Sequence, residues 1–493
     1  MSGLKLLFDT NVFYACEDIS PTRLHVNAEL ATRLKQLALQ SNCELFLHPA
    51  TKSDIGNTES IPMRQASLLK MRQWRLLAPF DARSGLAKEA GYATPLSPND
   101  EVDLQMLASL DNNATDFLIT EDRRLRNHVV RAGLGDRALS ILGGIEYLER
   151  FLGESTVLPT VEERVGYQLS VDDPFFDSLK LDYAPFESWF REKVQRKSRP
   201  CRVVFGANGE IEALAILKIE SGREHDLAGK LLKVCTFKVA PQAGGAKRGE
   251  LILKSVFQFA QENGIDQIYV EVFPHHVGVV RLFSDFGFHE LDGRTQDGQL
   301  VLAKNRRPPP ESSQLDPLQF HRDFGPPAVL VRRAFVVPIQ PQWHDVLFPE
   351  ARIQGQLFGP NASGNAIMKA YLSRSLITTL APGDTLLFYR SIDLSAITVI
   401  GVVESVTRSS NADEIRRLVG LRTVYPDAEI RLMCEDDRSV LAILFRQDRV
   451  LPAPWPLRQL KKTRLLKGPP QTIQRVNDEG ALTWLRQQLN APR

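Results

Sequence analysis

Two short apolar segments in the first quarter of the chain each lead into an acidic residue, and this arrangement limits the folds that the segment can adopt. Residues 5–8 run directly into Asp9, and residues 117–120 are followed two positions later by Asp122. Short apolar runs with polar boundaries are typical of buried parallel strands, and open α/β sheets form their sites at the carboxyl ends of such strands. We therefore expect residues 1–153 to form a parallel-sheet α/β domain with Asp9 and Asp122 close together.

Two further acids lie between these segments. Asp54 lies on a segment that we expect to be helical, and Asp103 opens an amphipathic helical run. If the second strand returns beside the first, then Asp9, Asp103 and Asp122 converge. Carboxylates crowded into one crevice repel one another unless a hard divalent cation such as Mg²⁺ or Mn²⁺ compensates their charge. A site of this kind favours phosphodiester hydrolysis, in which the metal activates water.

The order of these residues resembles the PIN domains, a family of metal-dependent ribonucleases, over roughly residues 1–150. The resemblance rests on Asp-Thr-Asn after the first strand, an acid on a helix, a second acid heading a helix, and Thr-Glu-Asp after a later strand. It implies that the catalytic and metal-binding residues are Asp9, Asp54, Asp103 and Asp122. PIN nucleases usually carry glutamate where this chain has Asp54, and Asp100 and Asp116 are the alternative ligands. Taken singly, each acid also fits a strand-end or helix-start cap.

The length of the chain predicts more than one domain. A typical domain length of about 150 residues gives about three domains for 493 residues. The formal net charge of +2 provides no global basic field for nucleic-acid binding. The five cysteines are scattered and include no Cys-x-x-Cys pair, so we expect reduced thiols with neither a zinc site nor disulfides. No signal-peptide pattern and no membrane-spanning apolar stretch is present, and we expect a cytoplasmic protein with no membrane partner.

Residues 160–305 have an order of their own. Strand patterns at 211–219 and 231–239 precede a glycine-rich, basic segment that leads into a helix at 251–263, and a further strand follows at 267–272. A glycine-rich turn between a strand and a helix exposes backbone N–H groups at the positive end of the helix, which favours binding of a pyrophosphate. We expect this segment to bind a cofactor that carries a pyrophosphate. The cofactor-binding candidates are Val239, Gly244, Gly245, Lys247, Arg248, Gly249 and Glu250. Alone, such a turn also fits a plain connection between two elements.

This order resembles the GNAT acetyltransferases over roughly residues 165–305, which implies a GNAT-like α/β domain that binds acetyl-CoA and acetylates an amine. Phe283 replaces the tyrosine that protonates the departing thiolate in many members, and His276 lies near the usual asparagine. Phenylalanine cannot donate a proton. The imidazoles of His275 and His276 titrate near neutrality, and Glu271 can act as a base through water, so these residues are candidates. A structural role for the two histidines is the alternative.

The consecutive prolines at 308–310 predict a linker at 306–327, because such a run favours an extended, semi-rigid spacer. The remaining residues, 328–493, are rich in strand patterns. These patterns lie at 330–337, 385–389, 397–404 and 440–445. We expect a small, mostly β barrel.

Residues 364–375, with the turn at 382–384 and the segment 389–391, resemble the PUA-like group that includes ASCH and EVE domains. Members of this group present a pocket or cleft to RNA or modified bases, and the resemblance covers roughly residues 330–470. Basic side chains hold phosphates and tyrosines stack on bases when proteins bind single-stranded or irregular RNA. The RNA-binding candidates are Lys369, Tyr371, Arg374, Tyr389 and Arg390. An ordinary amphipathic helix with solvated basic residues is the alternative for residues 364–375.

Together these features favour an α/β multidomain enzyme that acts on RNA, such as tRNA, as a toxin or stress effector. In this hypothesis the first domain is a ribonuclease dependent on Mg²⁺ or Mn²⁺, and the second domain binds acetyl-CoA. A second hypothesis makes acetylation of an amine, on charged tRNA or on a protein, the main reaction, with the first domain as a docking module. A third is a non-catalytic scaffold that binds RNA or an antitoxin. An antitoxin protein and a second copy of the chain are the further expected partners.

Overall fold

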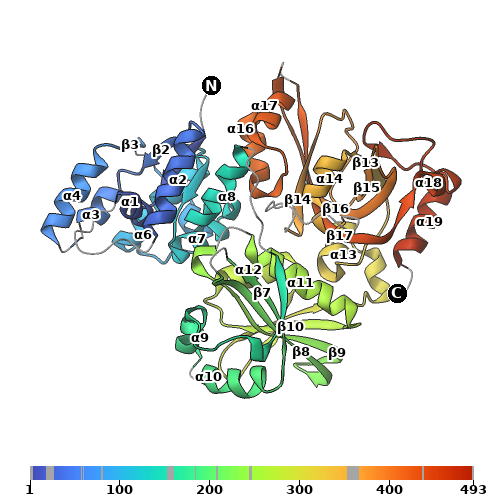
Figure 1. Ribbon diagram of the computed structural model, residues 1–493, viewed down its shortest axis with the longest axis horizontal. Helices are drawn as coiled ribbons and strands as arrows, with labels where there is room; N and C mark the ends of the chain where they lie inside the picture. The colour runs from blue at the N-terminus through green and yellow to red at the C-terminus, as the bar shows by residue number, and fades with distance from the viewer. Residues whose placement is uncertain are drawn as a thin grey trace.

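The chain folds into three lobes, each built around one β-sheet (Figure 1). In this view the blue-to-cyan first lobe and the orange-to-red third lobe lie side by side, with the green second lobe below them. The computed structural model describes residues 4–17, 27–56, 58, 60–78, 81–152, 160–183, 185–206, 209–243, 247–351, 366–435 and 438–490. Within these ranges no helix is both long enough and apolar enough to cross a membrane. All five cysteines are free thiols.

The first lobe has a five-stranded parallel sheet with the order β3-β2-β1-β4-β5. Its strands are β1 (Lys5–Phe8), β2 (Glu44–Leu47), β3 (Arg75–Leu76), β4 (Phe117–Ile119) and β5 (Ala138–Leu139). Its helices are α1 (Thr10–Glu17), α2 (Ala28–Gln40), α3 (Thr51–Gly56), α4 (Ile61–Met71), α5 (Leu86–Glu89), α6 (Pro98–Asp111), α7 (Arg123–Arg131), η1 (Gly135–Arg137) and α8 (Ile141–Phe151). The predicted parallel sheet is confirmed. Because β1 and β4 are parallel neighbours, Asp9 and Asp122 follow them at the same edge.

The second lobe has a seven-stranded mixed sheet with the order β11-β12-β10-β9-β8-β7-β6, in which β9 and β10 are the parallel pair. Its strands are β6 (Val161–Val165), β7 (Pro200–Phe205), β8 (Ile211–Glu224), β9 (Leu227–Val239), β10 (Gln267–Val272), β11 (His289–Arg294) and β12 (Leu300–Asn305). Its helical elements are η2 (Gly166–Gln168), η3 (Pro174–Phe176), α9 (Asp177–Asp182), α10 (Phe186–Trp189), η4 (Phe190–Gln195), η5 (Pro241–Ala243), α11 (Arg248–Glu262) and α12 (Val277–Asp285).

Strands β8 and β9 form a longer hairpin than the strand patterns at 211–219 and 231–239 predict. The hairpin closes between Glu224 and Leu227. His225 and Asp226 adopt positive φ values of 49° and 62° in the two-residue turn. A turn with positive φ at both positions matches the twist of the flanking strands. Residues 220–226 are mostly polar, so the pattern of apolar residues does not indicate that the strands continue through them.

Strands β9 and β10 separate toward their carboxyl ends. The backbone pairing between them ends at Val234 and Val270, although β9 continues to Val239 and β10 continues to Val272. Helix α11 connects the two strands and buries one apolar face against the sheet. The last residues of both strands are therefore available to flank a cavity.

The third lobe has a six-stranded mixed sheet with the order β14-β17-β16-β15-β13-β18. Its strands are β13 (Ala334–Ile339), β14 (Met368–Ser373), β15 (Thr385–Arg390), β16 (Ala396–Ser409), β17 (Val440–Pro456) and β18 (Gln474–Arg475). Its helical elements are α14 (Pro341–Leu347), η7 (Pro349–Ala351), α16 (Ala412–Val419), η8 (Gly420–Arg422), α17 (Asp427–Cys434), α18 (Leu457–Lys462) and α19 (Glu479–Asn490).

One expectation for the third lobe needs correction, and one alternative is excluded. Among the described strands, β14 and β18 are edges that do not pair with each other, so the sheet is open where a closed barrel was expected. Within the segment 364–375, residues 364 and 365 lie outside the described residues and 368–373 form strand β14, not a helix. The strand pairs along its whole length with β17, which satisfies the backbone groups on that side of the strand.

The predicted spacer at 306–327 is not extended. It contains η6 (Pro310–Gln314) and α13 (Pro317–Phe324), and α13 packs against β12 and β16. The buried Lys304 of β12 donates from Nζ to the carbonyl of Arg322 at 2.6 Å, and Arg322 pairs with Glu404 of β16. Prolines occupy the first positions of both helical elements, where the missing N–H group is tolerated. The segment therefore joins the second and third lobes as a packed element.

The three lobes meet at the amino end of α11. Arg422 of the third lobe pairs with Asp136 of the first lobe and with Glu250 of α11, both at 3.0 Å. Lys247 pairs with the same Asp136. Burial would raise the pKa of Glu250, but Arg422 and then Lys247 hold that pKa below its usual value. Four charged residues from three lobes thus form one ion-pair network, which we call the junction network.

Candidate functional sites

The four acids predicted in the first lobe come from four different elements. Asp9 follows β1, Asp54 lies on α3 and Asp103 lies on α6. Asp122 follows β4 and caps α7, accepting hydrogen bonds from backbone N–H groups in the first turn at 2.6 and 3.2 Å. Asp9 is 6% exposed, and the other three are half-buried.

Mutual electrostatic effects show that these carboxylates are close neighbours. Burial, and then Asp122, raise the pKa of Asp9 to about 6, although a hydrogen bond from the Thr120 hydroxyl at 2.6 Å lowers it. Burial and the charges of Asp122, Asp9 and Asp54 raise the pKa of Asp103 to about 7. The structure therefore brings all four together in what we call the acid cluster.

The oxygen ligands of the acid cluster suit a hard divalent cation. Mg²⁺ and Mn²⁺ prefer carboxylate oxygens, and Mg²⁺ usually keeps several of its waters. No three of these four acids have ligand atoms that all lie within 4.8 Å of one another. Such spacing fits a hydrated ion that contacts some carboxylates directly and others through water. The residues that would hold it are Asp9, Asp54, Asp103 and Asp122.

Asp100 and Asp116, the alternative metal ligands, make structural contacts outside the acid cluster. Asp100 completes a capping box with Ser97 at the start of α6, which places Asp103 in the second turn and not at the helix start. Asp116 precedes β4 and accepts the backbone N–H of Lys5 at 2.9 Å, so it lies at the opposite edge of the sheet from Asp9. It also pairs with Arg417 of the third lobe at 3.0 Å.

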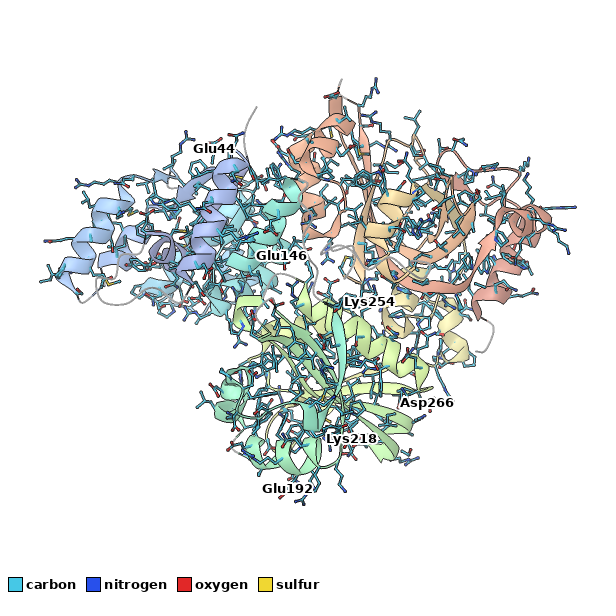
Figure 2. All side chains as sticks on the ribbon, in the orientation of Figure 1. Glu44, Glu146, Glu192, Lys218, Lys254 and Asp266 are labelled. Atoms are coloured by element: carbon cyan, nitrogen blue, oxygen red, sulfur yellow. The ribbon has the colours of Figure 1, made fainter. Side chains whose placement is uncertain are left out.

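The side chains of the predicted cofactor loop serve the contacts between lobes. Arg248 is 4% exposed and pairs with Glu212 at 2.6 Å and with Glu146 of α8, which Figure 2 labels where the first lobe faces the second. Lys247 and Glu250 belong to the junction network. A pyrophosphate at this loop would therefore depend on backbone N–H groups and not on these side chains.

The glycines of the loop are described only in part. Gly244 and Gly245 lie outside the described residues. Gly249 lies in the first turn of α11, where a Cβ atom would come within 2.9 Å of Leu282 on α12. Glycine here permits the close packing of two helices. Val239, the last residue of β9, lines the cavity described next.

A cavity of about 530 Å³ opens where β9 and β10 separate. Both strand ends, α9 and α10 line it, together with Arg123 of the first lobe. Polar groups in the lining include Asp182, Tyr183, Lys238, Glu271, His276 and Gln299. Arg123 directly follows Asp122, and α7 is attached to the second lobe by a hydrogen bond from Arg126 to the Pro241 carbonyl at 3.1 Å. The cavity, which we call the cleft, therefore borders the same helix as the acid cluster.

Two basic groups in the cleft have lowered pKa values. Burial, and then the nearby cation Arg123, lower the pKa of Lys238 to about 8. Its Nζ donates to the Phe175 carbonyl and to the Ser178 hydroxyl, the latter at 2.8 Å. Burial, and then His275, lower the pKa of His276. Both shifts favour the uncharged form, which is the form that can accept a proton.

Phe283 does not reach the cleft, but a tyrosine that the sequence did not single out does. Phe283 is fully buried, with ring centroids 4.9 Å from Phe237 and 4.7 Å from Phe288, so it belongs to the core. Tyr183 lines the cleft, and its hydroxyl accepts a hydrogen bond from Gln299 at 3.2 Å. Tyr183 follows α9 in a polar segment with no recognisable motif, and only the fold brings it to the cleft.

A second cavity, of about 1300 Å³, lies in the third lobe. Three of the five RNA-binding candidates line it: Tyr371, Arg374 and Tyr389. Trp343 and Tyr425 add aromatic surface and contact each other at 4.9 Å between ring centroids. The cavity can therefore accommodate a flat aromatic ligand beside a guanidinium group.

The other two RNA-binding candidates, Lys369 and Arg390, bond to groups within the protein. Lys369 is fully buried and donates from Nζ to the Leu347 carbonyl at 2.8 Å, and burial lowers its pKa well below the usual value. It cannot hold a phosphate at the surface. Arg390 pairs with Asp345 and with Asp393, the latter at 2.6 Å. The four central residues of strand β14 are buried on both faces, so Lys369 lies in the interior of the lobe.

No protein-family model matches this chain, and no curated protein matches its sequence. Among solved structures, the chain is similar to ASCH from Zymomonas mobilis, with 14% identity and a TM-score of 0.25 over 31% of this chain and 94% of that chain. It is similar to the PaiA N-acetyltransferase from Thermoplasma acidophilum in complex with coenzyme A, with 19% identity and a TM-score of 0.22 over 30% of this chain and 99% of that chain. A putative acyl-CoA N-acyltransferase from Klebsiella pneumoniae gives 12% identity and a TM-score of 0.23, with 30% and 99% covered.

Proposed function

We propose that the second lobe transfers an acyl group from acyl-CoA to an amine. The observation that carries this proposal is the separation of β9 and β10 around the cleft. Beyond Val234 and Val270 the facing backbone groups of the two strands no longer pair with each other. An extended arm with amide groups, such as the pantetheine of coenzyme A, can hydrogen-bond there as an added strand does. The cavity of about 530 Å³ provides room for that arm and an acceptor.

The polar lining of the cleft supplies the groups for the reaction. The amine attacks the thioester carbonyl, a C–N bond forms, the C–S bond breaks, the thiolate takes a proton from its donor, and the proton lost by the amine nitrogen restores that donor. Tyr183 is the proposed donor of that proton, because its hydroxyl lines the cleft and is held by Gln299. Arg123 and the backbone of the loop before α11 are the proposed anion-binding groups, since Lys247 and Arg248 serve the lobe contacts.

Filling the cleft should weaken acetyl-CoA binding. We expect Val239→Trp to weaken the binding of acetyl-CoA, measured by calorimetry on the full chain, by about 5- to 160-fold, because an overpacked site costs about 1–3 kcal/mol. Ile219→Trp on β8, at a residue 38% exposed and outside the cleft lining, is the matched control and should bind normally. Equal affinity in both variants, or no binding by the unaltered chain, would contradict the assignment.

Removing the Tyr183 hydroxyl should slow acyl transfer without loss of cofactor affinity. General-acid catalysis contributes about 10²–10⁴-fold, so we expect Tyr183→Phe to lower kcat within that range in an assay of thiol release. Tyr167→Phe, at a residue 65% exposed, is the control and should leave the rate unchanged. An unaltered rate in the Tyr183 variant would remove this residue from the proposed reaction.

A second candidate function is metal-dependent RNA cleavage by the first lobe. The convergence of Asp9, Asp54, Asp103 and Asp122 favours it, because carboxylates that raise one another's pKa are arranged to be neutralised by a cation. Mg²⁺ or Mn²⁺ would activate water for attack on a phosphodiester. The aromatic cavity of the third lobe is the proposed contact for the RNA. The test is loss of Mg²⁺-dependent cleavage of tRNA in Asp9→Asn.

A further inference from the structure

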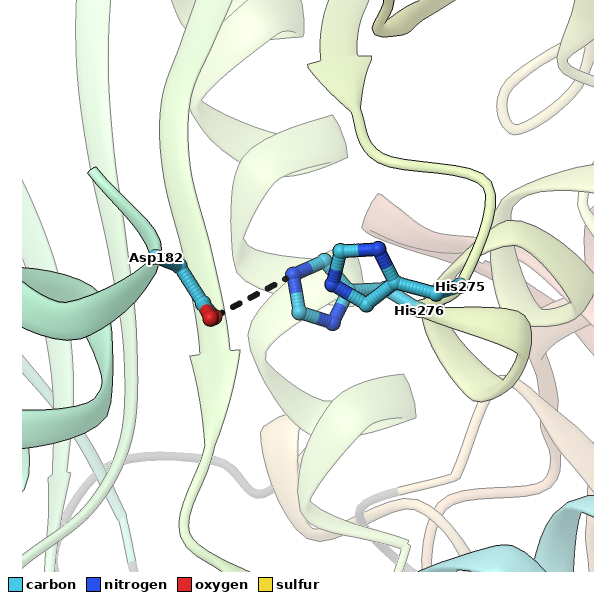
Figure 3. A group of neighbouring side chains, drawn as sticks. All are labelled: Asp182, His275 and His276. Carbon is cyan, nitrogen blue, oxygen red and sulfur yellow. Dashed lines mark ion pairs between the residues drawn. The ribbon is translucent and has the colours of Figure 1, made fainter.

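A group of metal-ligating side chains lies at the cleft, outside the acid cluster. Asp182, His275 and His276 each offer a ligand atom, and these atoms all lie within 4.8 Å of one another. Figure 3 shows that Asp182 approaches from the end of α9 while both histidines come from the turn between β10 and α12. His276 Nε2 and Asp182 Oδ2 lie 3.6 Å apart.

Contacts that involve no metal hold the two segments in register. The ring of Tyr183, which follows Asp182, lies 5.1 Å from the ring of Phe273. Phe273 in turn stacks on His275 at 5.5 Å with an interplanar angle of 14°. The turn itself is closed by a hydrogen bond from the His276 N–H to the Phe273 carbonyl at 3.0 Å. The fold therefore holds the two segments that carry the ligands next to each other, as a metal site requires.

The ligand set identifies the class of cation. Two imidazoles and one carboxylate suit Zn²⁺ and other first-row transition metals, whereas Mg²⁺ and Ca²⁺ prefer oxygen ligands alone. Metal–ligand bonds of about 2.0–2.1 Å in a tetrahedral site place ligand atoms roughly 3.3 Å apart, so the observed limit of 4.8 Å requires small side-chain movements. Asp182 and His276 also line the cleft, and an ion held by them borders its interior.

We propose that Asp182, His275 and His276 bind a divalent first-row transition-metal ion, with Zn²⁺ preferred, at the edge of the cleft. Three protein ligands leave a fourth position open, and that position is available to water or to a donor atom of a molecule in the cleft. Burial lowers the pKa of His276, which favours the neutral imidazole that binds metal. Arg123 and Lys238 lower the same pKa further, whereas Asp182 raises it. The site does not depend on acyl transfer by the second lobe.

The test is a Zn²⁺ titration of the untagged full chain against a chromophoric chelator, after EDTA treatment and in excess Mg²⁺ to occupy the acid cluster. We expect one Zn²⁺ per chain, and Co²⁺ should give the visible absorption of a nitrogen-ligated tetrahedral ion. His275→Ala and His276→Ala should each weaken Zn²⁺ binding by more than about tenfold, since losing even an outer partner of a metal ligand costs about 10–100-fold. His275 is exposed, so its variant should fold normally.

His289→Ala provides the matched control, because His289 is an exposed histidine of the same lobe that pairs with Asp323 at 3.0 Å. It should bind Zn²⁺ as the unaltered chain does. Absence of stoichiometric Zn²⁺ binding, or equal affinity in the His275 and His289 variants, would overturn the proposal. Calorimetry with acetyl-CoA on the same samples reports the proposed acyltransferase function separately, so failure of either one is recognised independently of the other.

Discussion

In Asp9→Asn, Mg²⁺-dependent RNA cleavage should fall to background while the metal-free protein becomes more stable at pH 8. The first effect follows from loss of a central carboxylate of the acid cluster, and the second from relief of an unfavourable buried charge. Asp9 is 6% exposed, and its pKa is raised from 3.8 to about 6 by burial and by Asp122. Asparagine keeps an oxygen that can accept the hydrogen bond from Thr120, so the local geometry should persist.

The pH dependence of this effect has a defined sign. A carboxyl whose folded-state pKa is raised favours the folded state below its ordinary value near 4, and that contribution is lost as the pH rises through the folded-state pKa. For Asp9 the window is therefore about pH 4 to 6, and for Asp103, with a pKa of about 7, it extends to neutrality. The difference between 3.8 and about 6 corresponds to about 3 kcal/mol of unfolding free energy, which is an upper value for the gain in Asp9→Asn at pH 8.

Chemical denaturation at pH 4 and pH 8, each with EDTA or with excess Mg²⁺, measures the expected pattern. Mg²⁺ should stabilise the unaltered chain at pH 8 and should have little effect on Asp9→Asn. Asp116→Asn is the control, because Asp116 lies at the opposite edge of the same sheet and pairs with Arg417. It should retain cleavage and gain no stability. Cleavage by Asp9→Asn at the normal rate would rule out the nuclease assignment.

The sequence was sufficient to predict which residues lie together where the candidate site depends on the order of the strands. Asp9 and Asp122 each follow a short apolar run, and parallel pairing of β1 and β4 is enough to bring them to one edge. It was insufficient where a side chain finds its partner in another lobe. Arg248 and Glu146 lie 102 positions apart, and Arg422 and Asp136 lie 286 positions apart. A basic residue in a glycine-rich loop looks the same in sequence whether it faces a phosphate or a buried glutamate.

The same limit explains the third lobe and the cleft. Lys369 was expected at an RNA-binding surface because basic side chains hold phosphates, yet it is buried within β14, which pairs with β17. Tyr183 and Asp182 carry no motif, and they meet His276 only because α9 packs beside the separated ends of β9 and β10. Sites assembled from loops that are distant in sequence therefore required the fold, whereas sites at the ends of adjacent parallel strands did not.

Arg422→Ala should strongly destabilise the whole chain. Arg422 is 5% exposed and pairs with Asp136 and Glu250, both at 3.0 Å, and donates to the Met368 carbonyl at 2.9 Å. Its removal leaves Glu250, which is 6% exposed, with Lys247 as its remaining cation at 3.9 Å. Breaking a buried ion pair from one side costs about 3–5 kcal/mol, because the other charge stays buried without compensation.

The loss of unfolding free energy in Arg422→Ala should depend on pH, because Glu250 changes its protonation state. In the unaltered chain Arg422 holds the pKa of Glu250 below its usual 4.5, so this carboxylate stabilises the fold above that pH and the contribution is lost as the pH falls. Without Arg422, burial raises the same pKa, and protonation below about pH 5 relieves the unpaired charge. The difference in unfolding free energy between Arg422→Ala and the unaltered chain should therefore be largest at neutral pH and should narrow toward pH 4.

Arg417→Ala is the matched control for this prediction. Arg417 also joins the first and third lobes, through Asp116 at 3.0 Å, but its side chain is 25% exposed compared with 7% for Arg422. A partly solvated pair contributes about 0–1 kcal/mol, so we expect a small loss with little dependence on pH. Urea denaturation of both variants at pH 7.5 and pH 4.5 distinguishes the two cases. Equal destabilisation in both variants, or a loss in Arg422→Ala that stays constant with pH, would show that the junction network does not hold the three lobes together.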